Sequence, residues 1–339
     1  MTTTTSAPTV LLLEGLRDRA IYIGGKAAAT KEGPNFSISS MLADAGYRAT
    51  EVPDEGREFA PDDLLFLRGS ANWFPKLWRT LEHTPDDRRP LVVFWQTEPL
   101  PQPSSAGLPR PRLHAREIAK ILLRDPNATD VYTNDRRLRR LHRRSLPHVL
   151  AVSSLDGADY LLERAITAAH VPLGYLPSHG RDLGLERDID VLFLGALNVP
   201  RRRRLLRRLR ARGIDVMAEG SWRDPAFWGE NRTQLINRAK IFLNLQRYPG
   251  AFSGRRLILG MANKALVVSE PFTSPAPYVP GKHFVGAPFE ELAAVIERYL
   301  ADERARRQIV EAGHAFVTQE LTMVRSVGRI LELARDSRP

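Results

Sequence analysis

The chain alternates short apolar segments with longer segments whose apolar residues recur every three to four positions. Apolar runs such as Leu91–Trp95 predict buried strands, and segments such as Pro34–Tyr47 predict helices with one apolar face. In the first half, strands are expected at Thr9–Leu13, Arg48–Val52, Asp63–Leu67, Leu91–Trp95, Asp130–Thr133 and His148–Val152. In the second half they are expected at Asp190–Gly195, Ile214–Met217, Lys240–Leu245 and Ala265–Ser269. Strands that alternate with helices predict an α/β fold with parallel sheets.

This alternation is interrupted once, between Ala169 and Arg187. The interval holds two prolines and three glycines, and no helix or strand of ordinary length fits it. We therefore interpret residues 171–187 as an interdomain linker between an N-terminal domain (1–170) and a second domain that starts at 188. Ligands commonly bind in the cleft between two domains.

Composition and charge narrow the function classes. A chain of 339 residues is long enough for two domains of roughly 150 residues. The absence of cysteine excludes a disulfide scaffold, a zinc–thiolate site and an iron–sulfur protein. No apolar stretch reaches the roughly 18 residues of a membrane span and the N-terminus lacks signal-peptide features, so we expect a soluble, cytoplasmic protein. The net charge of +11 favours acidic ligands: nucleotides, nucleic acid or anionic lipid.

The turn after the apolar run 190–195 is the first candidate site. The run ends at Gly195, and the following helix begins near Pro200 with Arg201 in its first turn. A helix N-terminus offers free N–H groups and partial positive charge to a phosphate. The alternative is that Arg201 belongs to a solvated arginine face, and the pattern leaves both interpretations open.

The turn after the run 240–245 is the second candidate. Gly254 would let a ligand approach the backbone, and Arg255 or Arg256 could form paired hydrogen bonds with a diphosphate. The alternative is a capping loop with surface arginines. Asn244 lies inside the strand, where a buried amide needs partners, so it is either a structural hydrogen-bonding residue or a ligand contact.

Ser269 and Glu270 form the third candidate, at the carboxyl end of the strand Ala265–Ser269. Ligands of open α/β sheets bind beyond the carboxyl ends of the strands. A carboxylate at that position could accept hydrogen bonds from sugar or ribose hydroxyls, whereas the alternative is a polar residue that merely ends a strand.

The first half and the linker offer weaker candidates. Gly24 and Gly25 lie in a strand-to-helix region and could face an acceptor. Glu98 follows the strand Leu91–Trp95 and is the candidate general base, with an ordinary loop carboxylate as the alternative. His179 could line the acceptor side of the cleft, or be a solvated histidine.

Two charged motifs are not interpreted as functional sites. Asp188-Ile189-Asp190 precedes its strand, whereas metal carboxylates would be expected at the other end, so no metal site is predicted. The basic run 136–144 has leucines at helical spacing and is interpreted as a solvated helix face; it lacks interleaved aromatic residues that would stack on bases. We expect no stable nucleic-acid partner and retain weak contact with an anionic membrane as an alternative.

The second half resembles the donor domain of GT-B glycosyltransferases, and is most similar to the spore-maturation-type branch of glycosyltransferase family 1 or 4. The resemblance rests on the order of four segments: DVLFLGALNVPRRRRLL, KIFLNLQRYPGAFSGRRLILGMANKALVVSEPF, YVPGKHFV and ELAAVIERYLADERARRQIVEAGHAFV. It covers roughly Pro172 to Leu333. The first half fits by its α/β pattern and position.

This resemblance implies two Rossmann-like domains that face each other across a cleft. It implies a nucleoside-diphosphate sugar bound to the second domain (188–321), an acceptor bound to the first, and a C-terminal helix (322–339) that crosses back to the first domain. No cofactor or metal is implied, since basic side chains and a helix N-terminus neutralise the diphosphate. The acceptor would be a small molecule, a lipid or a glycan.

The sequence departs from the family pattern at two glutamates. Those positions fall on Ala251 and Leu259, and the second glutamate usually holds the ribose. Ribose recognition would then differ, with Glu270 as a candidate, or the chain would be an inactive relative that serves as a nucleotide-sugar sensor or scaffold. A nucleic-acid-binding protein is the third hypothesis.

Overall fold

The computed structural model describes residues 13–25, 34–113, 115–123, 125, 128, 130–220 and 228–337. The chain divides into two compact units. The first unit contains Met1–Pro103, Arg110–Pro172 and Met323–Pro339, and the second contains Ser104–Pro109 and Leu173–Thr322. Among the described residues, no helix combines the length and the apolar character that crossing a membrane requires.

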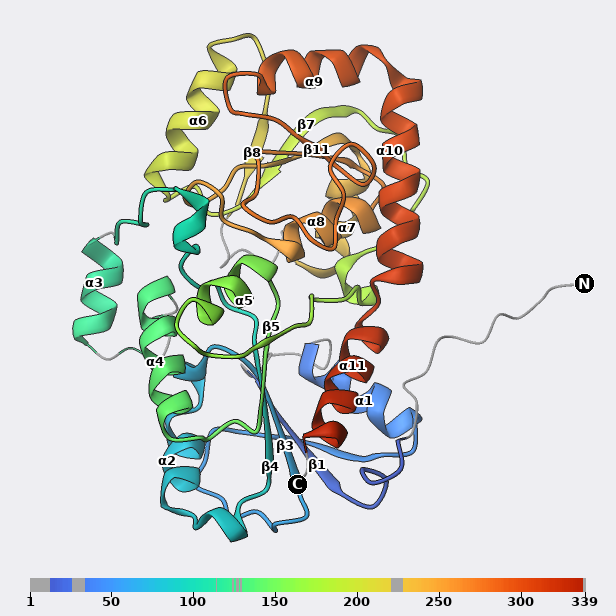
Figure 1. Cartoon of the computed structure of the whole chain (residues 1–339). Helices are drawn as coiled ribbons and strands as arrows, with labels where there is room; N and C mark the ends of the chain where they lie inside the picture. The colour runs from blue at the N-terminus through green and yellow to red at the C-terminus, as the bar shows by residue number, and fades with distance from the viewer. Residues whose placement is uncertain are drawn as a thin grey trace, which may run out of the picture. The chain divides into compact units, whose positions relative to one another are not determined.

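The first unit is built on a parallel sheet with the strand order β2-β1-β3-β4-β5-β6 (Figure 1). Every residue of the central strands β3 and β4 is buried, as expected for a parallel sheet covered on both faces. The strands are β1 (Ala20–Gly24), β2 (Arg48–Val52), β3 (Leu64–Gly69), β4 (Leu91–Gln96), β5 (Val149–Val152) and β6 (Ala169–His170). The α-helices are α1 (Pro34–Asp44), α2 (Pro75–His83), α3 (Ala115–Leu122), α4 (Val131–Arg143), α5 (Leu155–Leu162) and α11 (Met323–Asp336).

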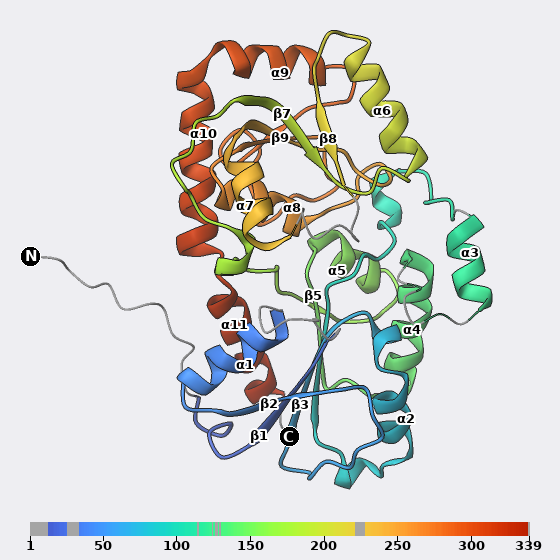
Figure 2. The ribbon, with the colours of Figure 1, turned by 180° about the vertical axis from the view of Figure 1, so that it is seen from behind.

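The last helix completes this first unit. α11 lies beside α1 (Figure 2) and also contacts β4 and β5. Its buried side chains include Val327, Ile330 and Leu331. Ser326 donates a hydrogen bond to the carbonyl oxygen of Pro172 at 2.8 Å. The C-terminal segment therefore packs on the unit that is formed by the beginning of the chain.

Two strands expected in the first half do not appear among the described strands. Residues 9–12 of the predicted strand Thr9–Leu13 lie outside the described residues, and the first strand of the sheet is Ala20–Gly24, which the apolar pattern did not single out. The strand predicted at Asp130–Thr133 is wrong, because α4 begins there. The carboxylate of Asp130 accepts hydrogen bonds from the backbone N–H groups of Tyr132 and Thr133, both at 3.0 Å. Asp130 is an N-cap, which satisfies the free donors of the first helical turn.

The second unit is a parallel sheet with the order β11-β10-β9-β7-β8. Its strands are β7 (Ile189–Leu194), β8 (Met217–Glu219), β9 (Ala239–Asn244), β10 (Leu266–Ser269) and β11 (Val285–Gly286). Its α-helices are α6 (Pro200–Arg210), α7 (Gly229–Asn237), α8 (Gly254–Ala262), α9 (Leu292–Ala301) and α10 (Glu303–Ala315). A short 3-10 helix η4 (Pro177–His179) and a π-helical turn η6 (Phe316–Glu320) complete it.

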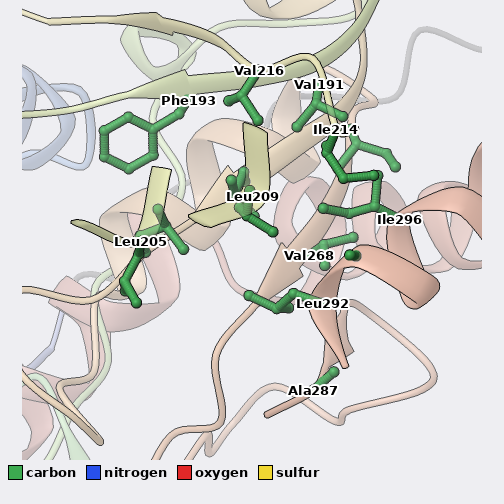
Figure 3. Packing of buried hydrophobic residues seen from close by; sticks show 14 of the residues in the cluster. Val191, Phe193, Leu205, Leu209, Ile214, Val216, Val268, Ala287, Leu292 and Ile296 are labelled. Atoms are coloured by element: carbon green, nitrogen blue, oxygen red, sulfur yellow. The ribbon is translucent and has the colours of Figure 1, made fainter. Parts of the chain in front are cut away.

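Alternate residues of β7 point into two different cores. Val191 and Phe193 pack with Leu205 and Leu209 of α6 and with Ile296 of α9, and Figure 3 shows these side chains together. Leu192 and Leu194 of β7 pack on the other face with residues of β9 and α8. Side chains that alternate in this way cover both faces of the sheet. The carboxyl ends of β7, β9 and β10 continue into the loops that follow them.

The predicted linker is bonded to the second unit beyond Pro172. Asn237 donates to the carbonyl oxygen of Arg181 at 2.9 Å, and Asn263 donates to that of His179 at 3.1 Å. Gly180, at φ +112°, passes so close to Asn263 that a Cβ would lie 2.3 Å from its side-chain oxygen. Two buried asparagines thus fix this segment on α7 and α8, where neither a long helix nor a long strand is needed.

A histidine of the first unit whose ring is bonded to the backbone makes stability depend on pH. The Nδ1 atom of His148 accepts a hydrogen bond from the backbone N–H of Val92 at 2.9 Å, so the folded state needs a neutral ring. Burial, with the nearby Arg89, lowers the pKa of His148 below its usual 6.5. Below pH 6.5, His148 therefore binds a proton in the unfolded chain but stays neutral in the folded chain. The free energy of unfolding falls as a result.

We expect the free energy of unfolding to decrease between pH 7 and pH 5, and the decrease to be smaller in His148→Gln, whose amide oxygen can still accept from Val92. Urea unfolding at both pH values measures this. An equal decrease in the variant and the parent chain would remove His148 as a contributor.

Candidate functional site

The candidate site lies at the carboxyl ends of β7, β9 and β10, where the first turns of α6 and α8 begin. Proline at the first helical position starts α6, which has no side-chain cap at its N-cap residue Val199. α8 also begins without a side-chain cap, at Ser253. These uncapped first turns lie in the same unit as the three strand ends, and most of the predicted donor-binding side chains are found there.

Arg256 occupies the centre of this region. Its guanidinium donates hydrogen bonds to the side-chain oxygen of Asn244 at 2.6 Å, to the carbonyl oxygen of Leu243 at 2.9 Å and to that of Leu194. All three acceptors are uncharged. Its remaining neighbours include Phe193, whose ring centre lies 5.1 Å away. Among the described residues, no carboxylate forms an ion pair with Arg256, so it is a cation held by neutral groups.

Gly195 makes room for this arginine. A Cβ at Gly195 would lie 3.1 Å from Nη1 of Arg256 and 3.0 Å from the Phe193 ring. On its other side, a Cβ at Gly220 (φ +150°) would lie 2.3 Å from the carbonyl oxygen of Gly195. Glycine at position 195 therefore allows the guanidinium to lie against the end of β7.

Asn244 and Ser269 are supporting residues. Asn244 is 1% exposed, accepts from Arg256 and donates to the Ser269 hydroxyl at 2.9 Å. Ser269 is fully buried, and its hydroxyl donates to the carbonyl oxygen of Glu270 at 2.7 Å. These hydrogen bonds satisfy the buried amide and hydroxyl, and a donor contact of Asn244 or Ser269 stays a prediction.

Arg201 and Glu270, expected to act separately, form an ion pair. Both nitrogens of the Arg201 fork donate to the carboxylate, one of them at 2.8 Å, and Arg201 also donates to the carbonyl oxygen of Gln246 at 3.0 Å. The backbone N–H of Gln246 donates to the same carboxylate at 2.9 Å. Since Glu270 is 4% exposed and both oxygens already accept hydrogen bonds, its charge serves to hold Arg201.

The charges of this cluster do not balance. Arg201, Arg202 and Arg256 are three guanidinium groups, and Glu270 is the one carboxylate bonded to them within the described part of the chain. Burial, reinforced by Arg202, lowers the pKa of Arg256 to about 9, and burial with Arg247 lowers that of Arg202 to about 10. Both remain cations at neutral pH, and burial together with neighbouring cations disfavours the charged form of each. An anion such as a diphosphate bound beside them would offset this effect.

The other predicted donor residues lie beside this cluster. Gly254 is buried in the first turn of α8, where a Cβ would meet Phe252 at 3.2 Å. Arg255 makes no side-chain hydrogen bond in the described structure, and its charge contributes to lowering the pKa of Arg232 to about 10, after burial. Leu259, which the resemblance was expected to align with a glutamate, is 8% exposed and packs in the core.

The acceptor-side candidates divide between the units. A Cβ at Gly24 would lie 2.5 Å from Leu67, so close packing explains this glycine, and Gly25 follows it at the end of β1. Glu98 is half-buried, two residues beyond β4, and its carbonyl oxygen accepts a hydrogen bond from Gln96 at 2.8 Å. His179, assigned above to the acceptor side, belongs to the second unit, where its ring accepts from the backbone N–H of Leu176.

The structure places the Asp-Ile-Asp motif at the amino end of β7. Asp188 is bonded to Arg238, and Asp190 to Lys240 at 2.6 Å, so both carboxylates have cationic partners at the edge opposite the candidate site. Within the described ranges, no group of three or more histidine, aspartate or glutamate side chains is arranged to hold a metal ion.

Gln246, like Arg202, is a residue of this site that the sequence did not single out. It is 3% exposed, its amide donates to the carbonyl oxygens of Glu270 and Pro271, and its oxygen accepts from the N–H of Gly250. It thereby joins the loops after β9 and β10. A polar residue just beyond a buried strand was the available signal, the same one that identified Ser269 and Glu270.

Comparison with known proteins identifies the fold. Residues 201–332 match the family model described as glycosyl transferase-like. No curated protein matches the chain significantly by sequence. The family match does not single out the spore-maturation-type branch, which stays a prediction.

Solved structures with the same fold have low sequence identity. TarM (Staphylococcus aureus) has a TM-score of 0.55 at 10% identity. The matched region covers 81% of this chain and 55% of TarM. Anabaena HepE, solved with UDP and glucose, has a TM-score of 0.58 at 11% identity. The matched region covers 93% of this chain and 98% of HepE. The pneumococcal O-GlcNAc transferase GtfA, solved with UDP and GlcNAc, has a TM-score of 0.53 at 8% identity. The matched region covers 82% of this chain and 57% of GtfA. The chain thus spans about half the length of TarM and GtfA and nearly all of HepE, and it has the GT-B glycosyltransferase fold.

Proposed function

We propose that this chain is a glycosyltransferase that moves a sugar from a nucleoside-diphosphate sugar to a small-molecule, lipid or glycan acceptor. The observation that carries the proposal is Arg256, a cation without a carboxylate partner in the described structure, at the meeting point of three strand ends. The match to the glycosyl transferase-like family over 201–332 includes this residue. HepE and GtfA were solved with UDP, so UDP is the first nucleotide to test.

The chemistry follows from the charge of the cluster. The bond between the sugar and the diphosphate of the donor breaks as the sugar bonds to the acceptor. Negative charge then develops on the departing diphosphate. Fixed cations aimed at that charge lower the barrier, because they need no rearrangement during the reaction. Arg256 and Arg202 would supply this stabilisation, with Arg201 held beside them by Glu270. In this mechanism the arginines take the part that a metal ion takes elsewhere.

Glu98 remains our proposal for the general base. Its position two residues beyond the buried strand β4 is a common place for a catalytic group in an α/β domain. The proposal concerns the first unit alone.

The second candidate function is that of an inactive relative that binds a nucleotide sugar. Leu259 is an apolar core residue where the family carries a glutamate, and Glu270 is engaged by Arg201. Leucine has no group that could accept a hydrogen bond from a ribose, and both oxygens of Glu270 already accept hydrogen bonds from this chain. This supports a site that binds phosphates more strongly than sugar.

Release of nucleoside diphosphate from a panel of sugar nucleotides tests both functions. The purified chain is incubated with UDP-, GDP-, ADP-, CDP- and dTDP-sugars, and free diphosphate is measured over time. The proposed enzyme releases one of them by slow hydrolysis, faster when an acceptor is added. Binding without any release, with or without acceptors, would leave the inactive relative.

A further inference from the structure

Two further arginines lie where α7 and α8 begin. Arg232 is in the first turns of α7 and Arg255 is in the first turn of α8, and we call them the α7–α8 pair. The two helices are joined where they end, because Asn237 donates to the side-chain oxygen of Asn263 at 3.0 Å. At their beginnings, the positive charge of Arg255 adds to burial in lowering the pKa of Arg232 to about 10. The two guanidinium groups therefore lie close enough to repel each other.

The α7–α8 pair has no compensating carboxylate among the described residues. Arg181 engages the carboxylate of Glu230, the acidic residue of α7, with hydrogen bonds of 3.0 Å from both nitrogens of its fork. Arg232 donates to the carbonyl oxygen of Ser178 at 2.6 Å, but its Nε is buried and has no partner in the described structure. Arg255 makes no side-chain hydrogen bond there. Both side chains are half-buried, so donors of the pair remain within reach of a ligand.

A structural arginine of the same unit has different surroundings. Arg187 donates to the carbonyl oxygens of Ala239 at 2.6 Å and Asn263 at 3.1 Å. Burial lowers the pKa of Arg187, and the nearby carboxylates of Asp182 and Glu311 oppose that effect. The α7–α8 pair lacks such carboxylates within the described ranges, so a structural role does not account for its two charges.

The α7–α8 pair lies beside Arg256. Arg255 and Arg256 are consecutive residues of α8, so their Cα atoms are about 3.8 Å apart and their side chains diverge by roughly 100°. Arg256 reaches the ends of β7 and β9, whereas the charge of Arg255 acts on Arg232 of α7. The first turn of α8 thus presents cations in two directions, and a ligand that binds Arg256 brings its other groups close to the α7–α8 pair.

An exposed aromatic ring adjoins the pair. Trp228 is the N-cap residue of α7, is 40% exposed, and its ring centre lies 5.9 Å from the guanidinium carbon of Arg232. The carbon-bound hydrogens of a sugar ring form an apolar face that packs on an aromatic ring. A carboxylate or phosphate on the same sugar pairs with arginine. Trp228 and the α7–α8 pair together therefore suit a sugar ring that carries negative charge.

The charges of a nucleotide sugar with a neutral sugar would leave this pair unmatched. Each phosphate of the diphosphate carries one negative charge, and Arg202 and Arg256 match these two. We propose, on the basis of the function proposed above, that the α7–α8 pair binds a further anionic group on the transferred sugar, a carboxylate or a phosphate. An arginine fork binds either group through paired hydrogen bonds. The donor is then a nucleotide with an acidic sugar, such as a hexuronic acid.

Calorimetric titration with sugar phosphates tests this proposal without knowledge of the base. Glucose 1-phosphate carries one phosphate, glucuronate 1-phosphate adds a carboxylate, and glucose 1,6-bisphosphate adds a second phosphate. We expect at least one of the added groups to increase the affinity about tenfold over glucose 1-phosphate, as a hydrogen bond to a charged group does. The group that gives the larger increase identifies the acidic sugar.

Variants of the pair locate the added group. Arg255→Ala and Arg232→Ala should each lose most of the increase, while their affinity for glucose 1-phosphate stays within about twofold of the parent's. Arg256→Ala should weaken the binding of all the ligands. Arg203→Ala, which removes an exposed charge from α6, is the matched control and should keep both the affinities and the increase. Arg255→Ala should unfold at the parent's temperature, so it carries the test even if Arg232→Ala is destabilised by losing its bond to Ser178.

The outcomes for the two proposals differ. Equal affinities for the sugar phosphates, or an increase that both pair variants retain, would overturn the acidic-sugar site. The proposed function would stand in that case if glucose 1-phosphate binds and Arg256→Ala weakens it. No binding of glucose 1-phosphate, or binding that Arg256→Ala does not change, would instead count against the proposed phosphate site and against the acidic sugar with it.

Discussion

Replacing Arg256 by alanine is expected to weaken the binding of UDP roughly ten- to hundredfold. A hydrogen bond to a charged group contributes about 1.5–3 kcal/mol, and every 1.4 kcal/mol changes the affinity tenfold. Arg256 reaches the ends of β7 and β9 at once and, like Arg202, has neutral hydrogen-bond partners, so its charge is available to a phosphate. Calorimetric titration of UDP into the parent and the variant measures the ratio of their affinities.

Two further variants separate this role from a general effect of charge. Arg203→Ala removes the same charge from an exposed position of α6 and should leave the affinity within about twofold, since exposed charges are screened. Arg256→Lys keeps the cation without the planar fork and should be intermediate. Equal affinities of Arg256→Ala and Arg203→Ala, in chains that unfold at the same temperature as the parent, would remove Arg256 from the site.

Replacing Glu270 by alanine should lower the free energy of unfolding by about 2–4 kcal/mol. Breaking a buried ion pair costs about 3–5 kcal/mol because one charge is left without compensation, and the exposure of Arg201 reduces this somewhat. The side chains are 20% exposed for Arg201 and 5% for Glu270. The N–H of Gln246 would lose its acceptor as well. Urea unfolding gives the difference.

The matched control for this variant is Asp190→Ala. Asp190 pairs with Lys240 at 2.6 Å on the surface, where their side chains are 55% and 33% exposed, and such a pair contributes about 0–1 kcal/mol. If Glu270→Ala were as mild as Asp190→Ala, the Arg201–Glu270 pair would not support the site, and a direct contact of Glu270 with the donor would become the better interpretation.

The elements with a clear apolar period were predictable, and those defined by a cap were not. β4 and β7 are continuous apolar runs, and the structure places them within a residue or two of their expected bounds. The residues after Asp130 are compatible with a strand. The hydrogen bonds that the Asp130 carboxylate accepts from two backbone N–H groups favour a helix instead. The pattern of apolar residues contains no information about such a bond.

The candidate site shows the same division. Residues at strand ends could be selected because parallel strands bring their carboxyl ends to one edge of the sheet. Which side chains bond to each other could not be predicted: Arg201 and Glu270 are separated by 69 positions and were given different ligands, yet they pair. The sequence could not name the partners of the buried Asn244 either, which are Arg256 and Ser269.

The thermal unfolding of the parent chain with UDP, GDP, ADP, CDP and dTDP tests the central claim most directly. A ligand at about a hundred times its dissociation constant adds roughly 2.7 kcal/mol to the stability of the folded state. For a unit of this size, each kcal/mol raises the unfolding temperature by about 2–4 °C. We predict a rise of several degrees with one of the five nucleotides, which would identify the base of the donor. No rise with any of them at saturating concentration would contradict a nucleoside-diphosphate site at the ends of β7, β9 and β10.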